Sequence, residues 1–308
     1  MRLGLITLML ASAITTAAIA QQNNPLAADA YRSQQEFLNS IDHPGVELVP
    51  TSDWSRCRSN GEIPRQQAIR SCGRVIGERS SRWESATAYY YRAMHYERLS
   101  DQQHAHDDFA EALRLFDEDI LSHRNSSARY YNRGILLQHV HEYDRAKVDF
   151  RRAAELSQEW DQPHFMLGNI AFETGDYAGA IAEYDLAASI NADNPYDQAS
   201  RCQARAAAGT DLETAAAACE EALRLSDSDK YTLFARGYLR FMQGDLNAAG
   251  ADFAAALAKD DDYSYAAYGA GVVALRQGRQ AEGDALMARA ADLSADDRAA
   301  IANAGLRP

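Results

Sequence analysis

Small residues recur along this chain at a nearly constant interval. The series consists of Gly134, Gly168, Cys202, Gly237 and Gly271, which follow one another in steps of 34 or 35 residues. Ala93 precedes Gly134 by 41 residues, and the polar stretch 117–127 accounts for the seven extra ones, so we expect a longer loop there. A fixed period of this length is typical of solenoids built from repeated supersecondary units. It constrains the fold more strongly than any single motif does.

The residues that follow each small residue also recur at fixed spacings. In the first three units Ala comes twelve residues later, an aromatic residue four after that, and Ala three further on: Ala105, Phe109, Ala112; Ala146, Phe150, Ala153; Ala180, Tyr184, Ala187. Two later units repeat the spacing with Ala249, Phe253, Ala256 and with Gly283, Met287, Ala290. Four units have a glycine seven residues after the small one: Gly175, Gly209, Gly244 and Gly278. Steps of three and four residues lie on one face of a helix, and glycine suits a left-handed helix end.

This pattern resembles the tetratricopeptide repeat (TPR) over about residues 54–295. The family has small residues at repeat positions 8, 20 and 27 and an aromatic residue at position 24. The resemblance implies an all-α TPR solenoid, a right-handed superhelix of about six helix-turn-helix units behind a degenerate N-terminal hairpin. The family's usual proline near the end of each unit is missing. Arg201-Cys202, Leu223-Arg224-Leu225 and Arg236-Gly237 are similar to exported TPR proteins of alphaproteobacteria.

The first twenty residues have the form of a secretory signal peptide. Arg2 precedes the apolar run 3–10, and Ala18-Ile19-Ala20 is a small-x-small cleavage site before Gln21. We expect a periplasmic or secreted protein, cleaved after Ala20, that is not an integral membrane protein thereafter. A retained membrane anchor is the alternative. The run is short for a membrane span and rich in small residues.

We expect four further segments. Residues 21–53 are predicted to form an N-terminal helix and linker, with a disordered leader as the alternative. Residues 54–82 are the degenerate, disulfide-bonded hairpin and 83–295 the TPR repeats. Residues 296–308 are a C-terminal cap with a short helix over the end of the stack. A separate catalytic domain needs about 100 residues, and this division leaves no room for one, so we expect a protein that is not an enzyme.

The four cysteines are Cys57, Cys72, Cys202 and Cys219, and they allow three pairings. In the TPR register Cys202 occupies position 8 and Cys219 position 24, which face each other across one hairpin. Cys72 occupies the same kind of position in the degenerate unit, with Cys57 on its first helix. Because exported chains are usually oxidised, we predict two disulfides, 57–72 and 202–219.

In TPR proteins the first helices line a concave face through repeat positions 2, 5, 9 and 12. In this register the inner positions include Tyr131, Phe165, Asn169, Phe172, Tyr196, Gln203, Tyr231, Phe234, Tyr238, Phe241, Tyr265 and Tyr268. Most of these residues are aromatic. An aromatic strip with a polar rim is typical of a groove for a peptide or an amphipathic helix. The alternative is that these rings pack between helices of a tight superhelix.

We therefore predict a non-catalytic scaffold that binds an extended or helical protein segment in an aromatic concave groove, without a cofactor. A regulatory or positioning subunit of an envelope enzyme complex is one alternative, and a self-assembling scaffold is another. The net charge of −13 argues against nucleic acid as a partner, because an acidic chain repels phosphate. The sequence does not set the oligomeric state.

Three other motifs carry less weight. Gly269–Ala274 matches the dinucleotide fingerprint, but it falls within a repeat's first helix rather than at a strand-to-helix turn. The pairs at 104/106 and 139/141 have the look of metal-ligating histidines, and we expect solvated turn residues instead. Arginines at repeat position 7 are expected to bond carbonyls of the neighbouring unit: Arg92, Arg133 and Arg236.

Overall fold

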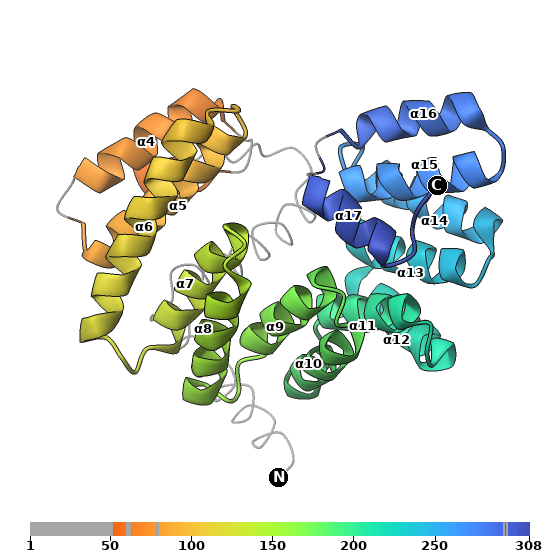
Figure 1. The fold of residues 1–308 in the computed structure, drawn as a ribbon, viewed down its shortest axis with the longest axis horizontal. Coiled ribbons are helices and arrows are strands. Elements are labelled where there is room, and N and C mark those ends of the chain that lie inside the picture. Colours follow the sequence, from red (N-terminus) through yellow and green to blue (C-terminus); the bar gives the residue numbers. More distant parts are fainter. Residues whose placement is uncertain (1–51, 60–62, 78–79, 292, 294) are drawn as a thin grey trace, which may run out of the picture. The chain divides into compact units, whose positions relative to one another are not determined.

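The computed structural model describes residues 52–59, 63–77, 80–291, 293 and 295–308. All regular elements in these ranges are α-helices (Figure 1). The described residues form two compact units, unit 1 up to Leu156 and unit 2 from Ser157 onward, and each contains a row of helix pairs. The predicted signal peptide and almost all of the predicted 21–53 segment lie outside the described residues.

In unit 1 the described helices pair in chain order. They are α3 (Asp53–Cys57) with α4 (Arg65–Gly77), α5 (Arg82–Glu97) with α6 (Gln102–Ser122), and α7 (Ser127–His139) with α8 (Tyr143–Leu156). Unit 2 continues with α9 (Gln162–Glu173) and α10 (Tyr177–Ile190), α11 (Pro195–Ala208) and α12 (Leu212–Ser226), α13 (Lys230–Met242) and α14 (Leu246–Lys259), and α15 (Ser264–Arg276) and α16 (Gln280–Arg289). The helix α17 (Ala295–Asn303) follows. The expected all-α solenoid of six TPR-like pairs, α5 to α16, is confirmed.

The two helices of each pair pack against each other at repeat positions 8 and 24. A Cβ atom built on Gly134, Gly168 or Gly237 would lie 2.6–2.8 Å from the ring of Phe150, Tyr184 or Phe253, respectively. All three rings are buried. The glycines therefore recur because the aromatic ring of the second helix lies directly on the backbone of the first.

The turn between paired helices has a left-handed residue at repeat position 15. The four predicted glycines there have φ between +65° and +84°, as expected. In the two units without this glycine, Ser100 and His141 occupy the same position with φ of 59° and 60°. An aspartate then begins the second helix in four pairs, where its carboxylate accepts the N–H three residues later: Asp101, Asp176, Asp211 and Asp245. Position 15 thus ends one helix, and in four pairs the aspartate one or two residues later caps the next.

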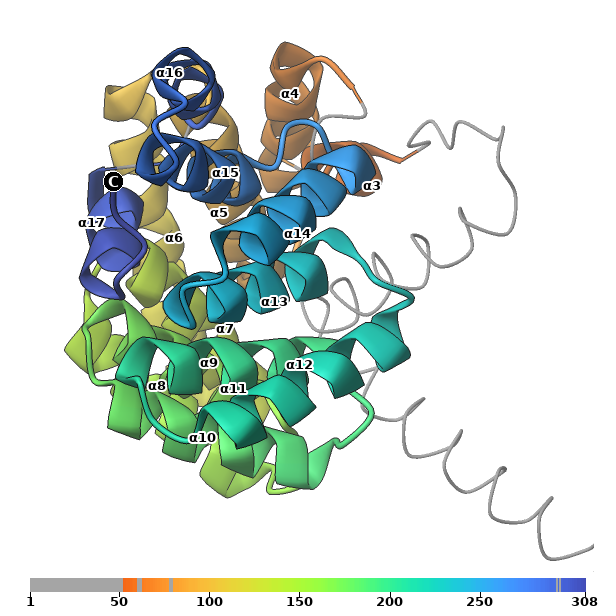
Figure 2. The ribbon, with the colours of Figure 1, turned by 90° about the vertical axis from the view of Figure 1, so that its right-hand side faces the viewer.

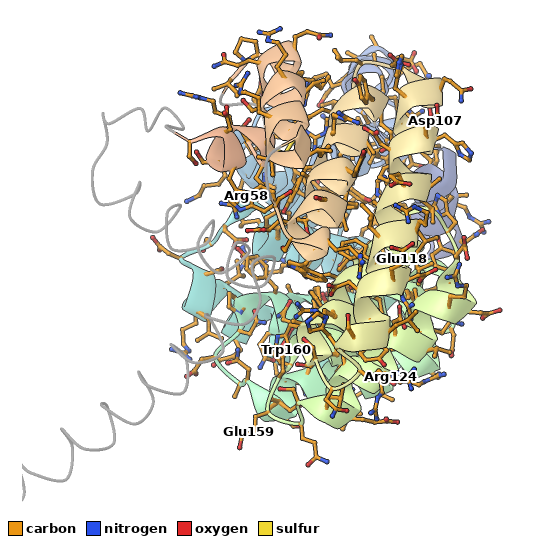
Figure 3. All side chains as sticks on the ribbon, turned by 90° about the vertical axis from the view of Figure 1, so that its left-hand side faces the viewer. Arg58, Asp107, Glu118, Arg124, Glu159 and Trp160 are labelled. Atoms are coloured by element: carbon orange, nitrogen blue, oxygen red, sulfur yellow. A yellow bond between two sulfur atoms is a disulfide. The ribbon has the colours of Figure 1, made fainter. Side chains whose placement is uncertain are left out.

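The predicted loop at 117–127 is wrong for its first half, because α6 runs on to Ser122. The seven extra residues add about two helical turns, which restores the phase of the buried face. Phe116 and Ile120 continue the stripe that begins at Phe109, and the Phe116 ring lies 5.1 Å from that of Trp83. Figure 3 shows Asp107 and Glu118 along this one long helix.

The position-7 arginines do not bond neighbouring carbonyls as expected. Each donates two hydrogen bonds, from Nε and Nη2, to the carboxylate of an aspartate sixteen residues later in its own hairpin. The pairs are Arg92–Asp108, Arg133–Asp149 and Arg236–Asp252, with distances of 2.7–3.0 Å. The three aspartates are buried. This repeated ion pair ties the first helix to the second beside the ring at position 24.

The four cysteines pair as the register predicts. Cys57 and Cys72 join α3 to α4 with Cα atoms 4.6 Å apart, and Cys202 and Cys219 join α11 to α12 with Cα atoms 5.3 Å apart. All four are fully buried. The second disulfide occupies positions 8 and 24, so a covalent bond replaces the glycine–ring contact of the other pairs.

Candidate functional site

A pocket opens on the inner side of unit 2. Its wall comes from the first helices of four successive pairs, α9, α11, α13 and α15, with one residue from α10, one from α17 and one just after α17. The lining residues are Asn169, Phe172, Glu173, Tyr184, Ser200, Gln203, Phe234, Tyr238, Tyr265, Ile301 and Ala304. The pocket has a volume of ≈170 Å³. A cavity of about 150 Å³ accommodates benzene, so this space fits one large side chain.

One side of the pocket is aromatic. The Phe234 ring centroid lies 5.5 Å from that of Phe253 and 6.0 Å from that of Tyr265. Phe234 is only 4% exposed, whereas Tyr265 is half-buried. The core ring of Phe253 thus supports Phe234 from behind, and Tyr265 presents the more accessible ring to a guest.

The opposite side is polar. The Tyr184 hydroxyl donates to Asn169 Oδ1 at 2.7 Å, from the second helix of the pair to the first. Burial raises the pKa of Tyr184, so its hydroxyl remains a donor at all ordinary pH values. Ser200 and Gln203 of α11 line the same side. The pocket therefore offers amide and hydroxyl groups opposite aromatic rings, a combination that suits a peptide with one apolar side chain.

The helix α17 closes part of this pocket. Ile301 and Ala304 line it, and the Tyr238 hydroxyl donates to the Ala304 carbonyl oxygen. Arg298 donates to the carbonyls of Ala290 and Leu293, just after α16. The structure therefore differs from the predicted cap over the end of the stack. Arg298 thus holds the start of α17 near the end of α16, and Ile301 reaches the pocket wall on the inner side of unit 2, which we describe as crossing that side; Figure 2 shows α17 below α16 and beside α15.

Next to the pocket, further rings form a continuous row, which we call the tyrosine row: Tyr196, Tyr231, Tyr263 and Tyr265. The centroid distances are 5.7 Å from Tyr196 to Tyr231, 5.4 Å from Tyr231 to Tyr263 and 5.9 Å from Tyr263 to Tyr265. Tyr231 is 45% exposed. Lys230 lies over two of these rings and is ion-paired with Asp260, so the row carries its own cation. Burial, followed by the negative charge of Asp229, raises the pKa of Tyr196 to about 12.

The structure divides the predicted groove residues into three groups. Six of them line the pocket: Asn169, Phe172, Gln203, Phe234, Tyr238 and Tyr265. Tyr196 and Tyr231, with Tyr265, belong to the tyrosine row. The other four pack against other groups: Phe165, Phe241, Tyr268 and Tyr131. Phe165 lies against the Tyr184 ring, while Phe241 and Tyr268 are buried in the core of unit 2. Tyr131 belongs to unit 1, where it packs on Phe150.

Sequence reasoning missed five lining residues: Glu173, Tyr184, Ser200, Ile301 and Ala304. Tyr184 was assigned to the seam because it holds position 24, and its ring does fill that seam. Its hydroxyl nevertheless reaches the inner side through Asn169. Only the fold places Ile301 and Ala304 here, because no repeat spacing connects residues after 295 to the groove.

Within the described residues, no group of three or more His, Cys, Asp and Glu side chains is placed to hold a metal ion. The candidate histidines have other partners: His104 contacts Asp101, His139 contacts Glu97, and His141 contacts Tyr143. Gly269–Ala274 lies inside α15. The helices of the described residues also include no candidate for a membrane span.

No family model matches the chain. The TPR repeat-containing thioredoxin TTL4 of Arabidopsis thaliana is 38% identical over 78 residues, which cover 25% of this chain and 11% of that protein. A tetratricopeptide repeat protein from Parabacteroides merdae superposes with a TM-score of 0.58 and 14% identity, covering 79% of this chain and 91% of that one. The APC/C hetero-tetramer Cut9-Hcn1 contains a chain with a TM-score of 0.58 and 14% identity, covering 86% of this chain and 50% of that one. These similarities establish the TPR fold.

Proposed function

We propose that this chain is a non-catalytic scaffold, exported to the periplasm or secreted, that holds a segment of another protein against the inner side of unit 2. The pocket made by four successive first helices carries the proposal. It combines rings on one side with amide and hydroxyl groups on the other, and it lies beside the tyrosine row. A bound segment would place one apolar side chain in the pocket and lie along the row.

The fold supports a role in binding proteins. The neighbour in the Cut9-Hcn1 hetero-tetramer is a chain within a protein assembly. A solenoid offers an extended inner surface, and short helical or extended segments are common ligands of such surfaces. The ≈170 Å³ pocket is also below the range of about 300–1,000 Å³ typical of small-molecule sites.

The test uses accessible residues, since Ala in place of the buried Phe234 or Tyr238 would also create a core cavity. The full chain is immobilised and exposed to envelope proteins of its host, and captured proteins are identified by mass spectrometry. We expect the variant Tyr265→Ala/Gln203→Ala to lose a protein that the wild type captures. Leu186→Ala is the matched control, because Leu186 is 47% exposed on the second helix α10.

Circular dichroism and thermal melting should show equal folding of all three chains. Capture of the same proteins by the pocket variant and the wild type would reject the proposal. A captured enzyme whose activity changes on binding would instead assign the chain as a regulatory subunit.

A further inference from the structure

We infer that residues 298–307, the crossing segment, are the pocket's own ligand. A partner would then bind by presenting the C-terminal end of an amphipathic helix with the same side chains and would displace this segment. The inference deepens the proposed function and rests on it. It comes from the geometry of the crossing segment and from its contacts with the wall of unit 2.

The crossing segment ends in a Schellman turn. The N–H of Leu306 donates to the Ile301 carbonyl at 3.1 Å, and the N–H of Gly305 donates to the Ala302 carbonyl at 3.0 Å. Gly305 has φ +102°, which only glycine adopts readily. This turn brings an aliphatic side chain before the helix end close to one after it. Ile301 and Leu306 are 8% and 0% exposed, so both are buried.

The wall contacts this turn as it would contact a bound peptide. Besides the bond from Tyr238 to Ala304, Arg276 of α15 donates two bonds to the Arg307 carbonyl, at 2.9 and 3.2 Å. Both acceptors are main-chain oxygens, which any peptide can offer. A Cβ atom built on Gly305 would lie 3.0 Å from the Met242 side chain, so the turn lies close against α13.

The side chains recognised are therefore few. Ile301 and Ala304 line the pocket, and together with Leu306 they belong to the core cluster of unit 2. The partner motif is an aliphatic residue, a small residue three positions later, glycine, and a second aliphatic residue. Glu173 in the pocket lining disfavours an acidic residue at the first of these positions.

The crossing segment is separable from the repeats. Unlike the helices from α5 to α16, α17 has no partner in a hairpin; it touches α9, and the residues after it contact α13 and α15. Its displacement would leave each repeat's contact between positions 8 and 24 in place. With the segment bound, the remaining ≈170 Å³ admits only one side chain, so a partner helix must displace it.

The test uses a fluorescent peptide with the sequence of residues 295–308 and two full-length proteins, the wild type and Ile301→Asp. A tethered ligand competes at an effective concentration of about millimolar, which weakens binding of the same peptide in solution. We expect Ile301→Asp to bind the peptide at least about tenfold more tightly than the wild type, because its own segment is released. A control peptide carrying Asp in place of Ile301 should bind neither protein.

Equal binding of the peptide by both proteins, or binding by neither, would overturn the inference. If Ile301→Asp loses its helical circular dichroism signal, the variant has unfolded and the peptide test cannot be used. Hydrogen exchange of the wild type then tests the inference. Amides of residues 302–307 are expected to exchange about 100-fold faster than those of α13, because the segment detaches without global unfolding. Equal protection of these two sets of amides would show that the crossing segment is a permanent part of the core, and would contradict the inference.

The capture experiment separates this inference from the proposed function. If Ile301→Asp binds the peptide but neither protein captures a partner at the pocket, the proposed function is wrong. The inference that residues 298–307 bind the pocket of their own chain would then still hold. If both proteins capture the same partner at the pocket with equal affinity, the proposed function stands and this inference is wrong.

Discussion

In three of the pairs, glycine at repeat position 8 lies directly against the aromatic ring at position 24. Gly237 illustrates it, since a Cβ atom there would lie 2.8 Å from the Phe253 ring. Phe253 is fully buried and has no room to move aside. We therefore expect Gly237→Ala to lower the free energy of unfolding by about 1–3 kcal/mol, measured by urea denaturation.

Two comparisons identify the cause. A Cβ atom at Gly73, in α4, would lie 3.7 Å from Arg92 Nη1, an ordinary contact, so Gly73→Ala should raise stability by about 0.5–1 kcal/mol through helix propensity. In Gly237→Ala/Phe253→Leu the two effects should not add, because the smaller side chain makes room for the methyl group. Additive losses would show that the contact is not the source of the strain.

Asp197 at the start of α11 should make stability depend on pH. Its side chain is fully buried, and neither carboxylate oxygen has a hydrogen-bond partner in the described part of the chain. Burial, with the nearby charge of Asp161, raises its pKa to about 8. The folded state therefore keeps a proton that the unfolded state loses near pH 4, so the free energy of unfolding falls as pH rises from about 4 to 8.

Denaturation of the wild type and Asp197→Asn at several pH values measures this contribution. The asparagine variant should gain stability relative to the wild type as pH rises towards 8, and the difference should level off above that. A constant difference across this range would mean that Asp197 is ionised in the folded protein.

At the scale of elements, the repeated arginine–aspartate pair joins the two helices of a hairpin. Asp149 of α8 is 1% exposed, and Arg133 of α7 is its bidentate partner. Removal of the arginine leaves a buried charge without its partner. We expect Arg133→Met to cost about 3 kcal/mol in urea denaturation. Arg133→Met/Asp149→Leu should cost less, because it removes the buried charge as well. An equal cost for both would assign the loss to packing.

The repeat register was enough to predict most of the fold from the sequence. Steps of 34 or 35 residues located five of the six pairs, and a step of 41 located the first. The register also gave the four glycine turns and the cysteine pairing, because each depends on spacing within one repeat. The register did not predict the extension of α6, because residues 117–122 are polar enough to suggest a loop. Phe116 and Ile120 were the available signal: they continue the buried face in helical steps of four residues.

The candidate site was predictable only in part. Six predicted residues reach the pocket because their repeat positions face inward: Asn169, Phe172, Gln203, Phe234, Tyr238 and Tyr265. The same register could not separate them from Phe241 and Tyr268, whose burial depends on packing with neighbouring helices. The path of α17 depends on tertiary contacts outside the repeat, so no periodicity could reveal it.

At the scale of the molecule, the central claim is that the inner side of unit 2 receives a protein segment. Site-specific photo-crosslinking in the full chain tests it most directly, with the photoreactive residue at Gln203 in the pocket or at Leu186 on α10. Position 203 should crosslink to residues 298–307 in the isolated protein and to a defined segment of a partner in the host envelope. Position 186 should do neither. Partner crosslinks from position 186 alone would contradict the account.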